Sequence, residues 1–120
     1  ELLEHPCQVG DTTLIHGYVG EASPEALKQA VDALAARRPD AVIALASSNE
    51  GKAAFAVAVP PALVKRGLHA GRLAGAIAKL AGGGGGGRPE RAQAGGRDGA
   101  KAPAAVAKVS ELVEQLLAPR

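Results

Sequence analysis

The sequence predicts an α/β fold, a single two-layer domain in which a small mixed sheet has helices packed against it. Apolar, β-branched segments alternate with segments whose apolar residues recur at helical spacing. The chain has 120 residues, a length that fits one domain. Aromatic residues make up only 2% of the sequence, so the core must be built from Ala, Val, Leu and Ile.

The first half of the chain predicts a strand, a helix and a second strand. Residues 9–19 contain the β-branched and aromatic side chains typical of a strand. Residues 23–25 (Ser-Pro-Glu) predict a helix start, because Ser is a preferred N-cap and Pro is tolerated at the first helical position. We expect this helix to end at Pro39. Residues 41–46 are continuously apolar, as in a central strand that is buried on both faces.

The second half begins with a predicted hairpin. Residues 47–51 have turn chemistry, residues 52–59 are apolar again, and two prolines follow. A short helix is then indicated by apolar residues at helical spacing, namely Leu73, Ile77 and Leu80. Residues 92–97 are compatible with an edge strand. From Pro103 onwards, a terminal amphipathic helix is indicated by Val106, Val109, Val113 and Leu116.

The most unusual feature lies between the last two predicted helices. It is a run of six glycines: Gly82, Gly83, Gly84, Gly85, Gly86 and Gly87. Ordering so many glycines costs conformational entropy, and that cost is reasonable where the backbone must approach a partner closely. We expect a glycine-rich loop here. From the residues alone, contact with a nucleic-acid backbone, a small-anion site and a purely structural or mobile loop all stay open.

Charge is distributed unevenly along the chain. Residues 1–50 carry three basic and eight acidic side chains, a net charge of −5, whereas residues 51–120 carry eleven basic and four acidic ones, a net charge of +7. The glycine run lies in the basic part, which favours an anionic partner. The candidate RNA contacts are Lys52, Arg88, Arg91 and Arg97. An arginine can bond a phosphate or stack on an exposed base, and each of the four is otherwise a solvated surface cation. Gln93 offers polar contact to a base or ribose, or to the loop backbone instead.

Catalytic and metal-binding chemistry find little support in the sequence. His5, His16, His69 and Cys7 lack the spacing of zinc ligands, and no nucleophile with its base is evident. The glycine run lacks the Lys-Ser/Thr ending of a P-loop. We therefore expect a non-catalytic chain with no cofactor. The single cysteine fits a reducing cytoplasm, and no apolar stretch of about 18 residues predicts a membrane span.

Three successive segments together strongly resemble a known signature: the glycine run, the Arg88-Pro89-Glu90 segment after it and residues 92–96 (Ala-Gln-Ala-Gly-Gly). It is the glycine-rich motif near the C-terminus of alanyl-tRNA synthetases, in their DHH-associated domain. The resemblance implies a domain that does no chemistry and binds the outer corner of tRNA(Ala), where the D and T loops meet. It would thereby help one tRNA to reach the catalytic and editing domains of a parent alanine–tRNA ligase. Position 91 departs from the pattern, because the family often has an apolar residue there.

The resemblance also suggests how the chain is divided. Residues 1–8 would be the remnant of a preceding helical segment or linker, and residues 9–120 the globular tRNA-binding domain. The family uses its C-terminal region in dimerisation, so a homodimer is a further expectation. Two alternatives stay open: the substrate-binding domain of a DHH-type phosphodiesterase or exonuclease, whose metal ligands would lie in a preceding domain, and a purely structural dimerisation module.

Overall fold

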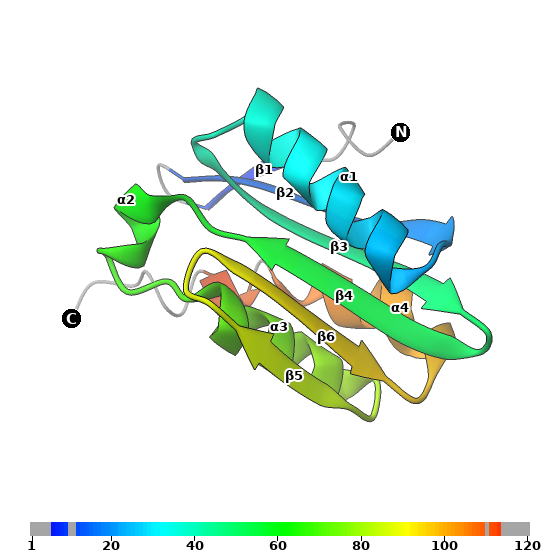
Figure 1. The fold of residues 1–120 in the computed structure, drawn as a ribbon. Coiled ribbons are helices and arrows are strands. Elements are labelled where there is room, and N and C mark those ends of the chain that lie inside the picture. Colours follow the sequence, from blue (N-terminus) through cyan, green and yellow to red (C-terminus); the bar gives the residue numbers. More distant parts are fainter. Residues whose placement is uncertain (1–5, 10–11, 110, 114–120) are drawn as a thin grey trace.

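The computed structural model describes residues 6–9, 12–109 and 111–113, arranged around one mixed sheet (Figure 1). The sheet has six strands in the order β1-β2-β3-β4-β6-β5, and β2 with β3 is the one parallel pair in it. The strands are β1 (Pro6–Val9), β2 (Thr12–Glu21), β3 (Ala41–Asn49), β4 (Lys52–Ala58), β5 (Gly84–Gly87) and β6 (Arg91–Gly96). The helices are α1 (Pro24–Arg37), α2 (Pro61–Val64), α3 (Ala70–Leu80), the 3-10 turn η2 (Gly99–Lys101) and α4 (Ala102–Ala107).

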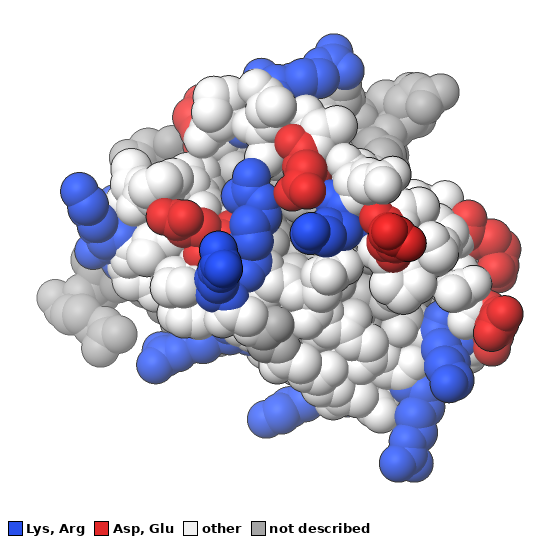
Figure 2. Space-filling view, in the orientation of Figure 1, with Lys and Arg blue, Asp and Glu red and all other residues white. Residues whose placement is uncertain are grey.

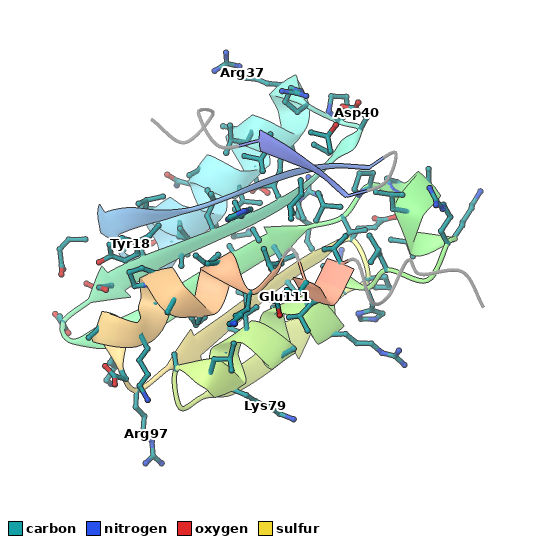
Figure 3. The ribbon with its side chains drawn as sticks, turned by 180° about the vertical axis from the view of Figure 1, so that it is seen from behind. Tyr18, Arg37, Asp40, Lys79, Arg97 and Glu111 are labelled. Atoms are coloured by element: carbon teal, nitrogen blue, oxygen red, sulfur yellow. The ribbon has the colours of Figure 1, made fainter. Side chains whose placement is uncertain are left out.

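Helices cover both faces of the sheet. On one face, α1 buries Leu27 and Val31 against a cluster that includes Ile43 and Leu45 of β3. On the other, α3 and α4 pack on a larger cluster around Phe55 (Figures 1 and 3). The α/β class and the mixed sheet are confirmed, but the sheet is the middle of three layers rather than one of two. The second helical layer arises because β3 is apolar on both faces.

The ends of α1 and of the β3–β4 hairpin follow the sequence signals. The hydroxyl of Ser23 accepts a hydrogen bond from the Ala26 amide at 3.1 Å, so Ser23 caps α1 as predicted. Strands β3 and β4 meet at a two-residue turn, Glu50 and Gly51, whose φ angles are 55° and 81°. Residues 47–49, which we expected in the turn, extend β3 instead.

The first glycine of the run terminates helix α3. Gly82, with φ at 79°, follows the helix, its amide donates to the Lys79 carbonyl, and the amide of Gly83 donates to the Ala78 carbonyl. This pair of hydrogen bonds is the Schellman arrangement, which favours glycine because the left-handed backbone suits a residue without a Cβ. The first glycine of the run is therefore a helix stop.

The rest of the run differs from the expected loop. Gly84–Gly87 form strand β5, which pairs antiparallel with β6 and lies at the edge of the sheet. Accordingly β6 is an inner strand, and our expectation of an edge strand over residues 92–97 was wrong. The reason is that backbone hydrogen bonds to β6 satisfy the glycine backbone, and the absence of side chains lets α3 lie directly against β5.

The two ends of the chain bear on the remaining expectations. Strand β1 begins at Pro6, so the sheet already includes residues 6–8, which we assigned to a preceding segment; residues 1–5 lie outside the described part. Near the C-terminus, α4 ends at Ala107, and Val109 and residues 111–113 are helical again. Val106, Val109 and Val113 are buried in the core as the amphipathic pattern predicted, whereas Leu116 lies outside the described residues.

Candidate nucleic-acid interface

On the α1 side of the sheet, the helix leaves part of the surface uncovered. Helix α1 lies over β3 and β4, whereas β6 and β5 extend beyond it (Figure 1). We call this uncovered surface the open face and define it by Gly84 of β5 and by Arg91, Gln93 and Gly95 of β6. Figure 2 shows it as mostly uncharged surface, with Lys and Arg side chains near both of its ends and Asp and Glu side chains close to them.

Strand alternation determines which residues lie on the open face. Ala92 and Ala94 belong to the core on the α3 side. Since successive side chains of a strand point to opposite faces, Arg91, Gln93 and Gly95 point toward the α1 side. Gly84 is paired with Gly95 and therefore shares its face. The open face is thus mostly bare backbone between a few polar side chains.

The glycines that face α3 are required by packing. A Cβ at Gly85 would lie 2.6 Å from the Cα of Ala94, and one at Gly87 would lie 2.8 Å from the Cα of Ala92. Helix α3 is equally close: a Cβ at Gly71 would lie 2.8 Å from the Gly87 carbonyl oxygen, and one at Gly75 would lie 3.0 Å from that of Gly85. The helix and the strand therefore pack backbone to backbone.

Gly84 is different, because a Cβ built there would meet no atom within 4 Å. Its backbone conformation is also open to any residue, since its φ is not positive. Packing therefore leaves the identity of Gly84 unexplained. At Gly84, therefore, a side chain would cover the open face without disturbing the fold.

Two hollows lie along the open face, each bordered by cations from separate parts of the chain. The first lies near the start of α1 and the end of β6, and its lining includes Pro24, Lys52, Gly83, Gly95 and Arg97. The second lies between α1 and the β5–β6 turn, and its lining includes Lys28, Asp32, Gly87, Arg88 and Arg91. The fold therefore gathers Lys52, Arg88, Arg91, Arg97 and Gln93 around one surface.

The candidate side chains differ in what holds them. The Arg91 Nε donates to Asp32 Oδ1 at 3.2 Å, and the Gln93 Nε2 donates to the Pro24 carbonyl at 3.1 Å. Gln93 thus bonds backbone, although that backbone belongs to α1 and not to the glycine run. Within the described ranges, three of the candidate cations make no side-chain hydrogen bond or ion pair: Lys52, Arg88 and Arg97.

Backbone contacts fix the β5–β6 turn that carries Arg88. The Pro89 carbonyl accepts from the Ala70 amide at 2.8 Å, and the Glu90 carbonyl accepts from the Val59 amide at 2.9 Å. The turn is therefore tied to the start of α3 and to the end of β4. Arg88 projects from a fixed position beside the open face, with an exposed side chain.

Sequence reasoning missed two kinds of residue. Lys28 and Asp32 reach the second hollow from α1, about 60 positions before Arg91, and nothing local in the sequence indicates that proximity. Gly71 and Gly75 did carry a signal, because glycines four apart lie on one face of a helix and permit close packing. Their spacing within α3 would have indicated the contact with β5.

Two further features, a metal cluster and a membrane-spanning helix, are absent from the described part of the chain. No three His, Cys, Asp or Glu side chains there gather closely enough to hold a metal ion. None of the helices described has the length and apolar character needed to cross a membrane. His5 lies outside the described residues, as does the side chain of Cys7.

Comparison with known proteins gives one consistent result. The family model described as the DHHA1 domain matches residues 11–115. The chain is 41% identical over 118 residues to the alanine–tRNA ligase of Nostoc punctiforme, and 41% identical over 109 residues to that of Shouchella clausii. These alignments cover 98% and 91% of this chain but only 13% and 12% of the two relatives.

A solved structure matches along almost its whole length. The crystal structure of the C-Ala domain from the Aquifex aeolicus alanyl-tRNA synthetase superposes with a TM-score of 0.78 at 30% sequence identity. The match covers 96% of this chain and 99% of that one. The arrangement of sheet and helices is thus similar to that of a single, separately solved domain.

Proposed function

The chain belongs to the DHHA1 family and corresponds to the C-Ala domain of alanyl-tRNA synthetases, and we propose that it binds tRNA(Ala). The domain itself is non-catalytic, and its parent protein would be the ligase that attaches alanine. We further propose that it contacts the outer corner of the tRNA and so aids both aminoacylation and editing. A homodimer and a cytoplasmic location stay predictions.

The open face carries this proposal. An exposed strand without side chains, between two groups of cations, suits a phosphate backbone, because RNA can approach the protein backbone closely while cations contact its phosphates. The first group is Lys52 with Arg97, and the second is Lys28 with Arg88 and Arg91. Asp32, the carboxylate that lines the second hollow, is already paired with Arg91.

The dimensions favour more than one phosphate contact. Strand β6 has six residues, and at about 3.3 Å per residue it separates the two groups of cations by roughly 20 Å. A single phosphate cannot span this distance, so a folded RNA surface or several consecutive nucleotides would be needed to engage both groups. This is the basis for proposing a structured region of tRNA as the ligand.

The test is a titration of the chain with a tRNA(Ala) transcript at several salt concentrations. With two to four phosphate contacts, log affinity should fall linearly with log salt, with a slope of roughly −2 to −4. Gly84→Val should weaken binding without unfolding the chain, and Lys52→Ala should make the slope shallower by about one. Arg37→Ala is the matched control, because Arg37 lies at the far end of α1 from Arg97 (Figure 3).

Footprinting on the same samples tests the proposed region of the tRNA. Protection should appear in the D and T loops. Protection confined to the acceptor end or the anticodon would contradict the outer-corner proposal while leaving tRNA binding intact. A folded Gly84→Val variant that binds as tightly as the native chain would rule out the open face as the site.

A further inference from the structure

Arg91 and Asp32 form the ion pair that links β6 to α1 beside the second hollow. The Arg91 Nε lies 3.2 Å from Asp32 Oδ1, and its Nη1 donates to the Glu90 carbonyl, also at 3.2 Å. We propose that Asp32 is a positioning residue, which holds the Arg91 guanidinium so that its remaining N–H groups meet a phosphate of bound RNA. This inference rests on the proposed function and names a residue that sets its affinity.

The geometry leaves Arg91 free to make this contact. A guanidinium has five N–H donors, and the two hydrogen bonds just described use two of them. The side chains of Arg91 and Asp32 are 45% and 48% exposed, so the pair is accessible to a ligand from the open face. Because Asp32 engages Nε alone, the pair is not the bidentate arrangement that would occupy the outer edge of the guanidinium.

The charge around the hollow still favours an anion. Lys28, Arg88 and Arg91 line the same hollow as Asp32, which gives three cations against one carboxylate. Lys28 lies one helical turn before Asp32, yet it forms no ion pair within the part of the chain that the structure describes. The lining of the second hollow is therefore net positive, even though Asp32 neutralises part of it.

Positioning is the contribution that Asp32 can make. The Arg91 backbone is fixed because β6 pairs with β4 and β5, but its long side chain has many rotamers. Immobilising such a side chain on binding weakens affinity by about two- to tenfold. Asp32 and the Glu90 carbonyl hold it in place beforehand, so that part of this cost is absent when RNA binds.

The experiment separates the position of Arg91 from the charge of Asp32. Affinity for a tRNA(Ala) transcript and its salt dependence are measured for Asp32→Asn, Asp32→Ala, Arg91→Ala and the Asp32→Ala/Arg91→Ala double variant. Asp40→Asn is the control for loss of a carboxylate, because Asp40 lies near the far end of α1 (Figure 3). Melting temperatures of all variants show that each remains folded.

We expect Arg91→Ala to weaken binding about three- to tenfold and to make the salt slope shallower by about one. Asp32→Asn should bind as tightly as the native chain or more tightly, because the amide oxygen still accepts from Nε while the negative charge is gone. Asp32→Ala should bind about two- to tenfold more weakly than Asp32→Asn, since Arg91 is then released. In the Arg91→Ala background, Asp32→Ala should cause no further loss.

Two results would overturn the inference. Equal affinities of Asp32→Ala and Asp32→Asn would mean that only the charge of Asp32 matters, and an Arg91→Ala variant with native affinity would mean that Arg91 does not contact RNA. If either result is found while Gly84→Val still weakens binding in the same assay, the open face remains the binding site and only the role of Asp32 in positioning Arg91 fails. If the native chain does not bind tRNA at low salt, the proposed function and this inference fail together.

Discussion

Adding one methyl group at two neighbouring positions of β5 should have opposite effects on stability. A Cβ at Gly84 meets nothing within 4 Å, whereas a Cβ at Gly85 would lie 2.6 Å from both the Cα and the Cβ of Ala94. The Gly85 methyl group would also approach the Gln93 carbonyl oxygen to 2.9 Å. Relief requires β5 to move away from β6, because the atoms in the way belong to the backbone or to the short side chain of Ala94.

The expected magnitudes follow from these distances. Replacing glycine by alanine where the backbone allows it stabilises by about 0.4–1 kcal/mol, since the unfolded chain loses freedom. Gly84→Ala should therefore keep or slightly raise the free energy of unfolding. Overpacking a site costs about 1–3 kcal/mol. Gly85→Ala should consequently lower the free energy of unfolding by about 1–2 kcal/mol after the entropic gain is subtracted.

Urea denaturation of the two variants and the native chain measures the difference. The change is chemically the same in both variants, so each is the control for the other. Equal destabilisation of both would refute the assignment of Gly84 to the open face. A Gly85→Ala variant as stable as the native chain would refute the close packing of β5 and β6.

Two further predictions concern the β3–β4 turn and the buried hydroxyl of Ser48. Glu50→Asn should raise the free energy of unfolding by about 0.5–1 kcal/mol, because Asn is preferred over Glu at a positive φ in a two-residue hairpin. An unchanged or lower midpoint of urea denaturation would contradict this prediction. Ser48→Ala should lower the free energy of unfolding by about 1–3 kcal/mol, because the buried Ser48 hydroxyl donates to the Gly99 carbonyl and accepts from the Tyr18 hydroxyl. Tyr18→Phe should lower the free energy of unfolding less than Ser48→Ala does, since Tyr18 is 39% exposed. A lower melting temperature for Tyr18→Phe than for Ser48→Ala would refute this account.

Local signals in the sequence predicted those elements whose cause is local. The N-cap at Ser23 and the turn at Glu50–Gly51 are fixed by residues within a few positions of each other. The apolar run from Ala41 predicted a strand buried on both faces, and the burial of β3 confirms it. Its consequence, a helical layer on each face, also follows from that run, although we expected only two layers.

What could not be predicted depends on contacts between distant segments. A run of glycines has no side-chain pattern, so neither its pairing with β6 nor its edge position has a sequence signal. The partners of Arg91 and Gln93 lie on α1, about 60 to 70 positions earlier in the chain. The charge imbalance indicated a basic surface, but it did not indicate that Asp32, from the acidic half, would lie within it.

The glycine run combines two different requirements in one strand. At Gly82 the helix ends with a positive φ, and at Gly85 and Gly87 a side chain would collide with β6, so the fold accounts for glycine at these positions. Gly84 lies on the opposite face, where there is space for a side chain and no conformational need for glycine. Glycine there forgoes the stability that alanine would provide. A ligand that must approach the backbone of β5 from the open face would account for it, and the Gly84→Val measurement tests that explanation directly.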